Sequence, residues 1–349
     1  MVQPLGFPTA LHASDRSQAQ PGALEGSPVP LSTAWQSEFY SLLGSDVPDD
    51  VDKAYTLKEA NLPPTVFKFR AADPRALENL KDGLVWLSSA ARFNDPYDSS
   101  LSIDLESRLH ETFRENLRDD PPHELDAAEL AWVLGAGNPV EALTGVLRRK
   151  GTTDLTADEA SALHTEVAKN AGQLTQAVGA ELAALHQDAI QACAFTTEFK
   201  SLVMWAHYAD CHRGFCVAYA TAAMGARLRR QLYPVTYSKE RFSVAEHFSR
   251  FAASTEAFDP TAPSAQHLPV LAAVHKAIDW EYEREWRLIC ADETGRSGVP
   301  VTIGKPSAVY LGARMPAGFR QELLRLAAEI PCYEMRLSPT TFALEPARL

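Results

Sequence analysis

One stretch of this sequence constrains its fold more than any other. From about Leu105 to Ile190 the chain is rich in Ala, Leu and Glu and nearly free of β-branched runs, which predicts helices. Strand-like patterns precede it at Val66–Arg70 and Leu84–Ser88 and resume at Ala192–Thr197, without regular strand–helix alternation. We therefore predict an α+β fold, in which a mixed, mostly antiparallel sheet core carries a helical insertion at about 105–190.

The composition limits the classes of protein to which the chain could belong. The 349 residues are 46% hydrophobic, but no apolar run approaches the roughly 20 residues of a membrane span, so no membrane partner is expected. A net charge of −12 disfavours a nucleic-acid coat protein, which leaves nucleic acid open only as a specific substrate. Five cysteines, an odd number, predict reduced thiols in a cytoplasm or in the cytosol of a host cell.

The N-terminal segment differs in composition from the rest of the chain. Residues 1–34 are rich in Pro, Ser, Gln, Ala and Gly, which predicts a disordered tail. An alternative is an export leader of the kind that bacterial secreted effectors carry. Residues 35–349 are predicted to form a single domain that contains the helical insertion.

A first candidate block for binding runs through two predicted strands and the loop after them. Lys68 and Arg70 lie on the strand Val66–Arg70, where a basic side chain facing a cleft can hold a phosphate. Asp73 is a plausible N-cap and Gly83 a plausible end for the helix that follows. The second strand and its loop add the candidate cofactor-binding residues Ser88, Asn94, Asp95 and Tyr97, although Asn-Asp-Pro is also a strong structural turn signal.

A second block runs from Met204 to Tyr219. Its short predicted helix carries Trp205, His207 and Tyr208, which could stack on a ligand or bond to it. His207, Cys211, His212 and Cys216 raise the possibility of zinc, but their spacing does not match paired short ligand motifs. We favour roles in the core or in a polar network for these four residues.

The third block is Trp280–Arg287, WEYEREWR, which we predict to be one strand. Read at a period of two, Glu281, Glu283, Glu285 and Arg287 share one face, and the aromatic residues share the other. A row of like carboxylates is unfavourable unless cations or a ligand neutralise it. Glu285 and Glu283 are therefore candidate catalytic residues and Arg287 a candidate cofactor-binding residue; alternatively, the arginines only neutralise the row.

In this order the three blocks resemble the bacterial family DUF2971. The chain carries FKFR, then S-x-x-x-FNDP-Y-D at Ser89–Asp98, then MW-x-HYAD-x-H-x-GF-C at Met204–Cys216, then W-x-x-E-x-E-W-R at Trp280–Arg287. More distantly, the layout is similar to that of DarT-like ADP-ribosyltransferases, although the chain has no S-T-S triplet.

The more distant resemblance implies an NAD-consuming ADP-ribosyltransferase, acting as a toxin, effector or defence enzyme on a host macromolecule. NAD would be the substrate: Arg70 would hold its diphosphate or ribose, and Tyr97 or Tyr208 would stack on nicotinamide. Glu285 or Glu283 would stabilise the oxocarbenium ion. Two alternatives stay open, a Mg²⁺-dependent nuclease or phosphate-ester enzyme using Asp95, Asp98, Glu283 and Glu285, and a non-catalytic binding or immunity module.

Overall fold

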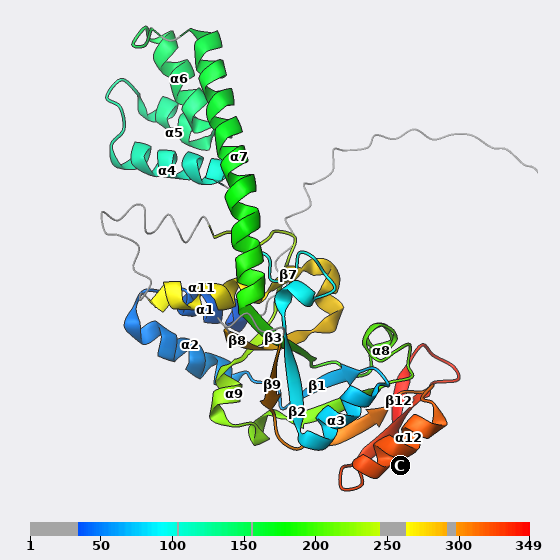
Figure 1. Ribbon diagram of the computed structural model, residues 1–349. Helices are drawn as coiled ribbons and strands as arrows, with labels where there is room; N and C mark the ends of the chain where they lie inside the picture. Colours follow the sequence, from blue (N-terminus) through cyan, green and yellow to red (C-terminus); the bar gives the residue numbers. More distant parts are fainter. Residues whose placement is uncertain (1–33, 103–104, 155, 245–262, 292–297) are drawn as a thin grey trace, which may run out of the picture. The chain divides into compact units, whose positions relative to one another are not determined.

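The computed structural model of the protein describes residues 34–102, 105–154, 156–244, 263–291 and 298–349 (Figure 1). Helices combine with a mixed, mostly antiparallel sheet, so the predicted α+β class is confirmed. The proposed N-terminal tail or export leader lies outside the described residues, except for its last position. None of the described helices is long and apolar enough to cross a membrane.

A ten-stranded sheet forms the core of the fold. Its main path runs β12-β11-β10-β4-β1-β3-β2-β9, while β8 pairs with β3 and with β5. Every pairing is antiparallel except that between β10 and β11. The strands are β1 (Thr65–Arg70), β2 (Leu84–Ser89), β3 (Ile190–Thr196), β4 (Phe215–Ala220), β5 (Leu232–Pro234), β8 (Glu285–Ala291), β9 (Gly298–Thr302), β10 (Ala308–Leu311), β11 (Cys332–Leu337) and β12 (Leu344–Arg348).

The sheet forks at β3. β1 pairs with β3 only where Phe67 meets Thr196, whereas β2 pairs with β3 only at its other end, where Ser88 and Ser89 meet Ala192 and Gln191. Beyond these contacts β1 continues along β4 and β2 continues along β9, so the two strands diverge. Between them, no strand of the described residues pairs with the middle of β3 on this edge, although β8 pairs with the other edge of β3 along its whole length.

Helices cover both faces of the sheet. α3 (Pro74–Asp82) and α12 (Ala317–Leu326) pack on the face that carries Val66, Phe195 and Leu288. α8 (Leu202–Tyr208) packs on the opposite face over Phe67 and Phe69. The apolar side chains of α1 (Ala34–Leu43) and α11 (Pro263–Ala273) form a further cluster with β3 and β8, beside α2 (Pro48–Ala60) and near α9 (Ala226–Arg230).

The expected ends of α3 are confirmed. The side chain of Asp73 accepts a hydrogen bond from the backbone of Ala76, which satisfies one of the free N–H groups of the first turn. Gly83 follows the last turn with φ 63°, a left-handed conformation that glycine adopts readily. Local sequence chemistry is thus sufficient to define this helix and to place the start of β2.

Helices occupy the described part of the stretch from 105 to 189: α4 (Leu105–Asp119), α5 (Ala127–Gly135), α6 (Pro139–Arg149) and α7 (Ala157–Ala189). They bury a cluster of their own around Leu117, Val133 and Val146. The last turn of α7 contacts the loop after β2, because Gln187 donates a hydrogen bond to the carbonyl of Asp98 at 2.9 Å.

The prediction of one strand over WEYEREWR is wrong in its first half. Ile278–Glu283 forms a 3₁₀ helix (η3), Arg284 adopts a left-handed conformation with φ 45°, and β8 begins only at Glu285. In a continuous strand the carboxylates would have formed a row, whereas the turn directs two of them to one cation, Lys276. The predicted alternation holds from Glu285 onward.

The helical spacing of Leu268–Ile278 predicts a helix over this segment, which the structure contradicts at its C-terminal end. α11 ends at Ala273, and β7 (His275–Ala277) pairs in parallel with β6 (Thr236–Ser238). Lys276 therefore lies on a short strand. This tertiary pairing, which the local pattern does not encode, overrides the helical spacing of the segment.

The turn between α8 and β4 is tight. Asp210, Cys211 and His212 all have positive φ, and Gly214 follows against β1. A Cβ atom added to Gly214 would lie 2.0 Å from the carbonyl oxygen of Arg70. Only glycine permits this close approach of two backbones, which fixes the end of β1 that carries Arg70.

We expect Gly214→Ala to destabilise the protein by about 1–3 kcal/mol or more, because the added methyl group must displace backbone. Gly172→Ala is the matched control, since Gly172 lies in α7 with nothing within 4 Å of an added Cβ. The control should be neutral or stabilise by up to about 1 kcal/mol. Denaturant unfolding measures both, and equal behaviour of the two variants would contradict the prediction.

Candidate functional site

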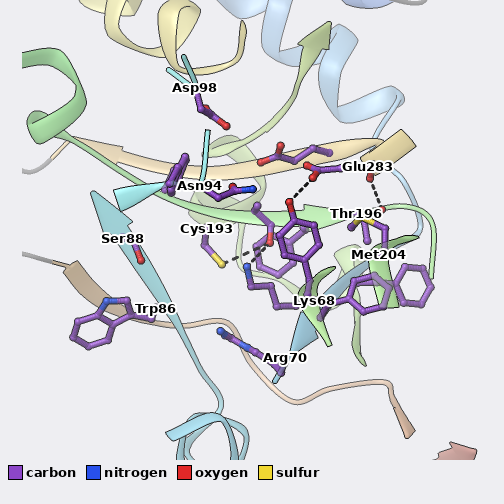
Figure 2. Close-up of a pocket in the computed structure, with 18 of the residues that line it drawn as sticks. Lys68, Arg70, Trp86, Ser88, Asn94, Asp98, Cys193, Thr196, Met204 and Glu283 are labelled. Carbon is purple, nitrogen blue, oxygen red and sulfur yellow. Dashed lines mark hydrogen bonds between the residues drawn. The ribbon is translucent and has the colours of Figure 1, made fainter. Parts of the chain in front are cut away.

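A cavity of about 320 Å³ lies at the fork of the sheet (Figure 2). This volume is at the lower end of the range for small-molecule sites. The side chains of β3 that share a face with Ser88 are Ala192, Ala194 and Thr196, and their small size leaves room above the strand. The lining comes from β1, β2, β3, α8, η3, β8, Lys276 on β7 and the loop after β2: Phe67, Lys68, Phe69, Arg70, Trp86, Ser88, Arg92, Phe93, Asn94, Asp98, Ala192, Cys193, Ala194, Phe195, Thr196, Met204, Tyr208, Lys276, Glu283 and Glu285.

Three cations line this cavity without a carboxylate partner among the described residues: Lys68, Arg70 and Arg92. Lys68 reaches into the fork and donates to the carbonyl of Ala194 at 2.7 Å, beside the thiol of Cys193. Burial lowers the pKa of Lys68. The guanidinium group of Arg70 has no hydrogen-bond partner in the described part of the chain, so its donors are free to bind an anion.

Glu283 faces the cavity from the end of η3. Its side chain accepts a hydrogen bond from the Tyr208 hydroxyl at 2.5 Å and another from Lys276 at 2.5 Å. Thr196 donates to the backbone carbonyl of Glu283, which fixes the turn against β3. In Figure 2, Glu283 and Asp98 lie at the end of the view opposite Arg70 and Trp86. The cavity thus combines a held carboxylate with uncompensated positive charge.

Behind Glu283 lies a buried network of ion pairs. Lys276 contacts Glu285 at 2.8 Å in addition to Glu283. Arg287 binds Glu285 through two of its nitrogens, at 2.7 and 3.1 Å, and binds both oxygens of Asp98, at 2.6 and 2.7 Å. All five side chains are at least 95% buried. Buried charges require this degree of pairing.

The structure shifts the pKa values of Glu283 and Glu285 in opposite directions. Burial raises the pKa of Glu283, and the Lys276 ammonium only partly opposes this. Burial also favours the neutral form of Glu285, but the charges of Arg287 and Lys276 outweigh it and lower the pKa of Glu285 to about 2. Glu285 is therefore a permanently ionised anchor for two cations, whereas Glu283 can exchange a proton in the cavity.

The structure brings together several of the residues singled out from the sequence. Lys68, Arg70, Ser88, Asn94, Tyr208, Glu283 and Glu285 all line the cavity. Of the remainder, Trp205 is fully buried in the core, where its indole N–H donates to the carbonyl of Phe199. Arg287 lies behind the lining, fully buried in the ion network.

The other candidates lie beside the cavity. Asp95 is buried and its side chain accepts a hydrogen bond from the backbone of Tyr97, which is the turn-forming role expected of this motif. The ring of Tyr97 is 62% exposed and lies 5.5 Å from the guanidinium group of Arg241. His207 is exposed and forms a 3.2 Å contact with the hydroxyl of Tyr282.

Sequence reasoning missed Lys276, Arg92 and Trp86. Lys276 was hidden inside an expected helix, although three glutamates within nine residues of it are a signal that a cation must be near. Trp86 lies between two apolar residues in a predicted strand, Val85 and Leu87, which give no sign of a binding role. Its exposed position depends on the divergence of β1 and β2, which the local sequence does not reveal.

The structure does not place the side chains considered for a zinc or a magnesium site as metal ligands. Among the described residues no group of three His, Cys, Asp or Glu side chains is placed to hold a metal ion. Cys216 is buried in β4, and the His212 ring stacks on Trp205 with their centroids 6.3 Å apart. For magnesium, the oxygens of Asp98 and Glu285 are already bound by Arg287. A magnesium ion would have to displace the guanidinium group of Arg287 from these oxygens.

Comparison with known proteins supports the family resemblance over part of the chain. Residues 204–288 match the model of the family described as a protein of unknown function, DUF2971. This range includes two of the blocks singled out from the sequence, Met204–Cys216 and Trp280–Arg287; the blocks at Phe67–Arg70 and Ser89–Asp98 lie outside it. No curated protein and no solved structure matches the chain.

The ion network predicts how stability depends on pH. The folded-state pKa of Glu285 is lowered, so its contribution is present above its unfolded value near 4.5 and is lost as pH falls through about 2. The difference corresponds to about 3 kcal/mol. The contribution of Glu283 to the pH dependence of stability has the opposite sign, because its raised pKa makes the folded state bind a proton more readily. Urea unfolding between pH 2 and 5 measures the sum of the two contributions to the free energy of unfolding.

Arg287→Met should lower the unfolding free energy at pH 7 by about 3–5 kcal/mol, because it leaves Asp98 and Glu285 buried without their guanidinium partner. It should also reduce the decrease in stability below pH 4.5. Arg325→Met is the control, since Arg325 forms an exposed pair with Glu322 and its loss should not be measurable. An Arg287 variant as stable as the control would contradict the assigned role of the network.

Proposed function

We propose that the cavity binds NAD and transfers its ADP-ribosyl group to a nucleophile, a macromolecular acceptor or water. One observation carries the proposal: the same cavity contains the guanidinium group of Arg70, unpaired among the described residues, and, toward its other end, the carboxylate of Glu283. The diphosphate of NAD needs a cation with free donors, and the reacting ribose needs a carboxylate. The cavity offers both in a protein whose net charge is −12.

The chemistry assigned to Glu283 follows from charge. When the bond between C1′ of the ribose and the nicotinamide nitrogen breaks, its electron pair leaves with nicotinamide and neutralises the pyridinium charge. Positive charge then develops on the ribose. An ionised Glu283 stabilises this oxocarbenium ion and accepts a hydrogen bond from a ribose hydroxyl. The acceptor oxygen or nitrogen then bonds to C1′ and releases its proton.

The other members of the site have supporting roles. Tyr208 and Lys276 hold the Glu283 carboxylate in place through hydrogen bonds of 2.5 Å each. Glu285 anchors Lys276, so we assign it a positioning role rather than the direct role that it shared with Glu283 in the sequence analysis. Ser88 and Asn94 line the cavity and are available for ribose or amide groups. An enzyme of this kind would act as a toxin, effector or defence protein.

Glu283→Gln should reduce nicotinamide release from NAD by about 10²–10³-fold, because the amide keeps the shape of the side chain but cannot stabilise positive charge. NAD binding, followed by calorimetry, should change little. Glu281→Gln is the matched control, because Glu281 lies two residues away in η3 and is not part of the cavity lining. If the Glu283 variant cleaves NAD at the wild-type rate, the proposal is wrong.

Tyr208→Phe should move the acid limb of the activity profile to higher pH. The Tyr208 hydroxyl bonds to the ionised form of Glu283 and so lowers the pKa of that carboxyl group; without it the pKa rises further. Activity requires the ionised form and is lost as pH falls through this pKa. The rate of nicotinamide release measured against pH tests this. If the acid limb of the profile is the same in Tyr208→Phe and in the wild-type protein, Glu283 is not the group that titrates there.

A further inference from the structure

Trp86 occupies an unusual position on β2. Its two neighbours, Val85 and Leu87, are fully buried in the core on one face of the sheet, whereas Trp86 is 43% exposed and lines the cavity. A large aromatic side chain in the middle of a strand usually gains stability from burial. Its exposure at the cavity leaves a flat apolar surface available to a ligand.

The indole of Trp86 is held by the neighbouring strand. A Cβ atom added to Gly298 on β9 would lie 2.1 Å from the indole nitrogen and 2.6 Å from the adjoining ring carbon. Gly298 therefore provides the space in which the indole rests against the backbone of β9. Trp86 is a fixed platform, which lowers the entropic cost of stacking a flat group on it.

The cavity at the fork contains a cation, Arg70, as well as the ring of Trp86. Trp86 lies on β2 and Arg70 lies on β1, and these strands diverge from β3, so the two side chains come from opposite arms of the fork (Figure 2). Lys68 lies closer to β3, bonded to Ala194. A flat ring and a cation with free donors that line one cavity match a nucleotide, which has a base and phosphates.

We propose that Trp86 stacks on the adenine base of the bound nucleotide while Arg70 holds its phosphates. The inference rests on the proposed function for its choice of nucleotide, and it deepens that function by assigning the orientation. The adenosine half of NAD lies at the Trp86–Arg70 end, and the nicotinamide ribose lies toward Glu283. Trp86 is then a specificity-determining residue, which distinguishes adenine nucleotides from other phosphates.

Binding of ADP and of inorganic pyrophosphate, each measured by calorimetry, tests this assignment. Pyrophosphate has the phosphates but no ring. Trp86→Ala should weaken ADP binding about tenfold or more and leave pyrophosphate binding unchanged, since stacking acts on the base alone. Trp86→Phe should retain most of the ADP affinity, and Arg70→Ala should weaken both ligands.

Trp132→Ala is the matched control. Trp132 is 54% exposed on α5, where its ring lies 5.6 Å from the guanidinium group of Arg149, and it is not part of the cavity. Its removal should change neither affinity. The inference is overturned if Trp86→Ala leaves ADP binding intact, if it weakens ADP and pyrophosphate equally, or if the wild-type protein does not bind ADP.

The same experiment separates this inference from the proposed function, because ADP has no nicotinamide bond to break. If Trp86→Ala weakens ADP selectively but wild-type protein does not cleave NAD, the nucleotide orientation stands and ADP-ribosyl transfer is wrong. If NAD is cleaved and its KM is unchanged in Trp86→Ala, the transfer stands and the role of Trp86 is wrong.

Discussion

The contact between Arg287 and its two carboxylates is the interaction on which the rest of the site depends. Arg287 is fully buried and joins β8 to the loop after β2 by binding Glu285 and Asp98 at once. Desolvating these charges is unfavourable unless all are paired, so losing one partner would destabilise the network. The network positions Lys276, and Lys276 in turn holds Glu283 at the cavity. The position of Glu283 at the cavity is thus fixed by ion pairs that lie behind it.

The fork of the sheet creates the space that this network borders. A strand normally has a neighbour along each edge, but the middle of β3 meets β8 on one edge and the cavity on the other. At this open edge, the carbonyl of Ala194 accepts a hydrogen bond from Lys68. Positive charge is therefore placed where the sheet opens. The tight turn at Gly214 packs against the same end of β1, so the position of Arg70 is set by backbone contacts.

Local patterns predicted the elements better than the site. The cap at Asp73, the end of α3 at Gly83 and the alternation from Glu285 onward required only short-range chemistry, and the structure has each of them. The prediction of a single strand over WEYEREWR was wrong because periodicity takes no account of the pairing of Glu283 and Glu285 with Lys276. The position of Lys276 results from β6 pairing with β7, a contact between segments almost forty residues apart, so no window of sequence contains it.

The sequence by itself determined that this chain is an α+β protein with a helical insertion, and that Glu283, Glu285 and Arg70 are chemically notable. The sequence was sufficient for this because helix and strand propensity, helix capping and the spacing of charged residues are local properties. Only the tertiary structure gave the two glutamates different environments. Both carry the same side chain, two residues apart, but Glu285 lies between Lys276 and Arg287, whereas Glu283 faces the cavity with Tyr208. Their environments shift the two pKa values in opposite directions, and these environments cannot be derived from the sequence alone.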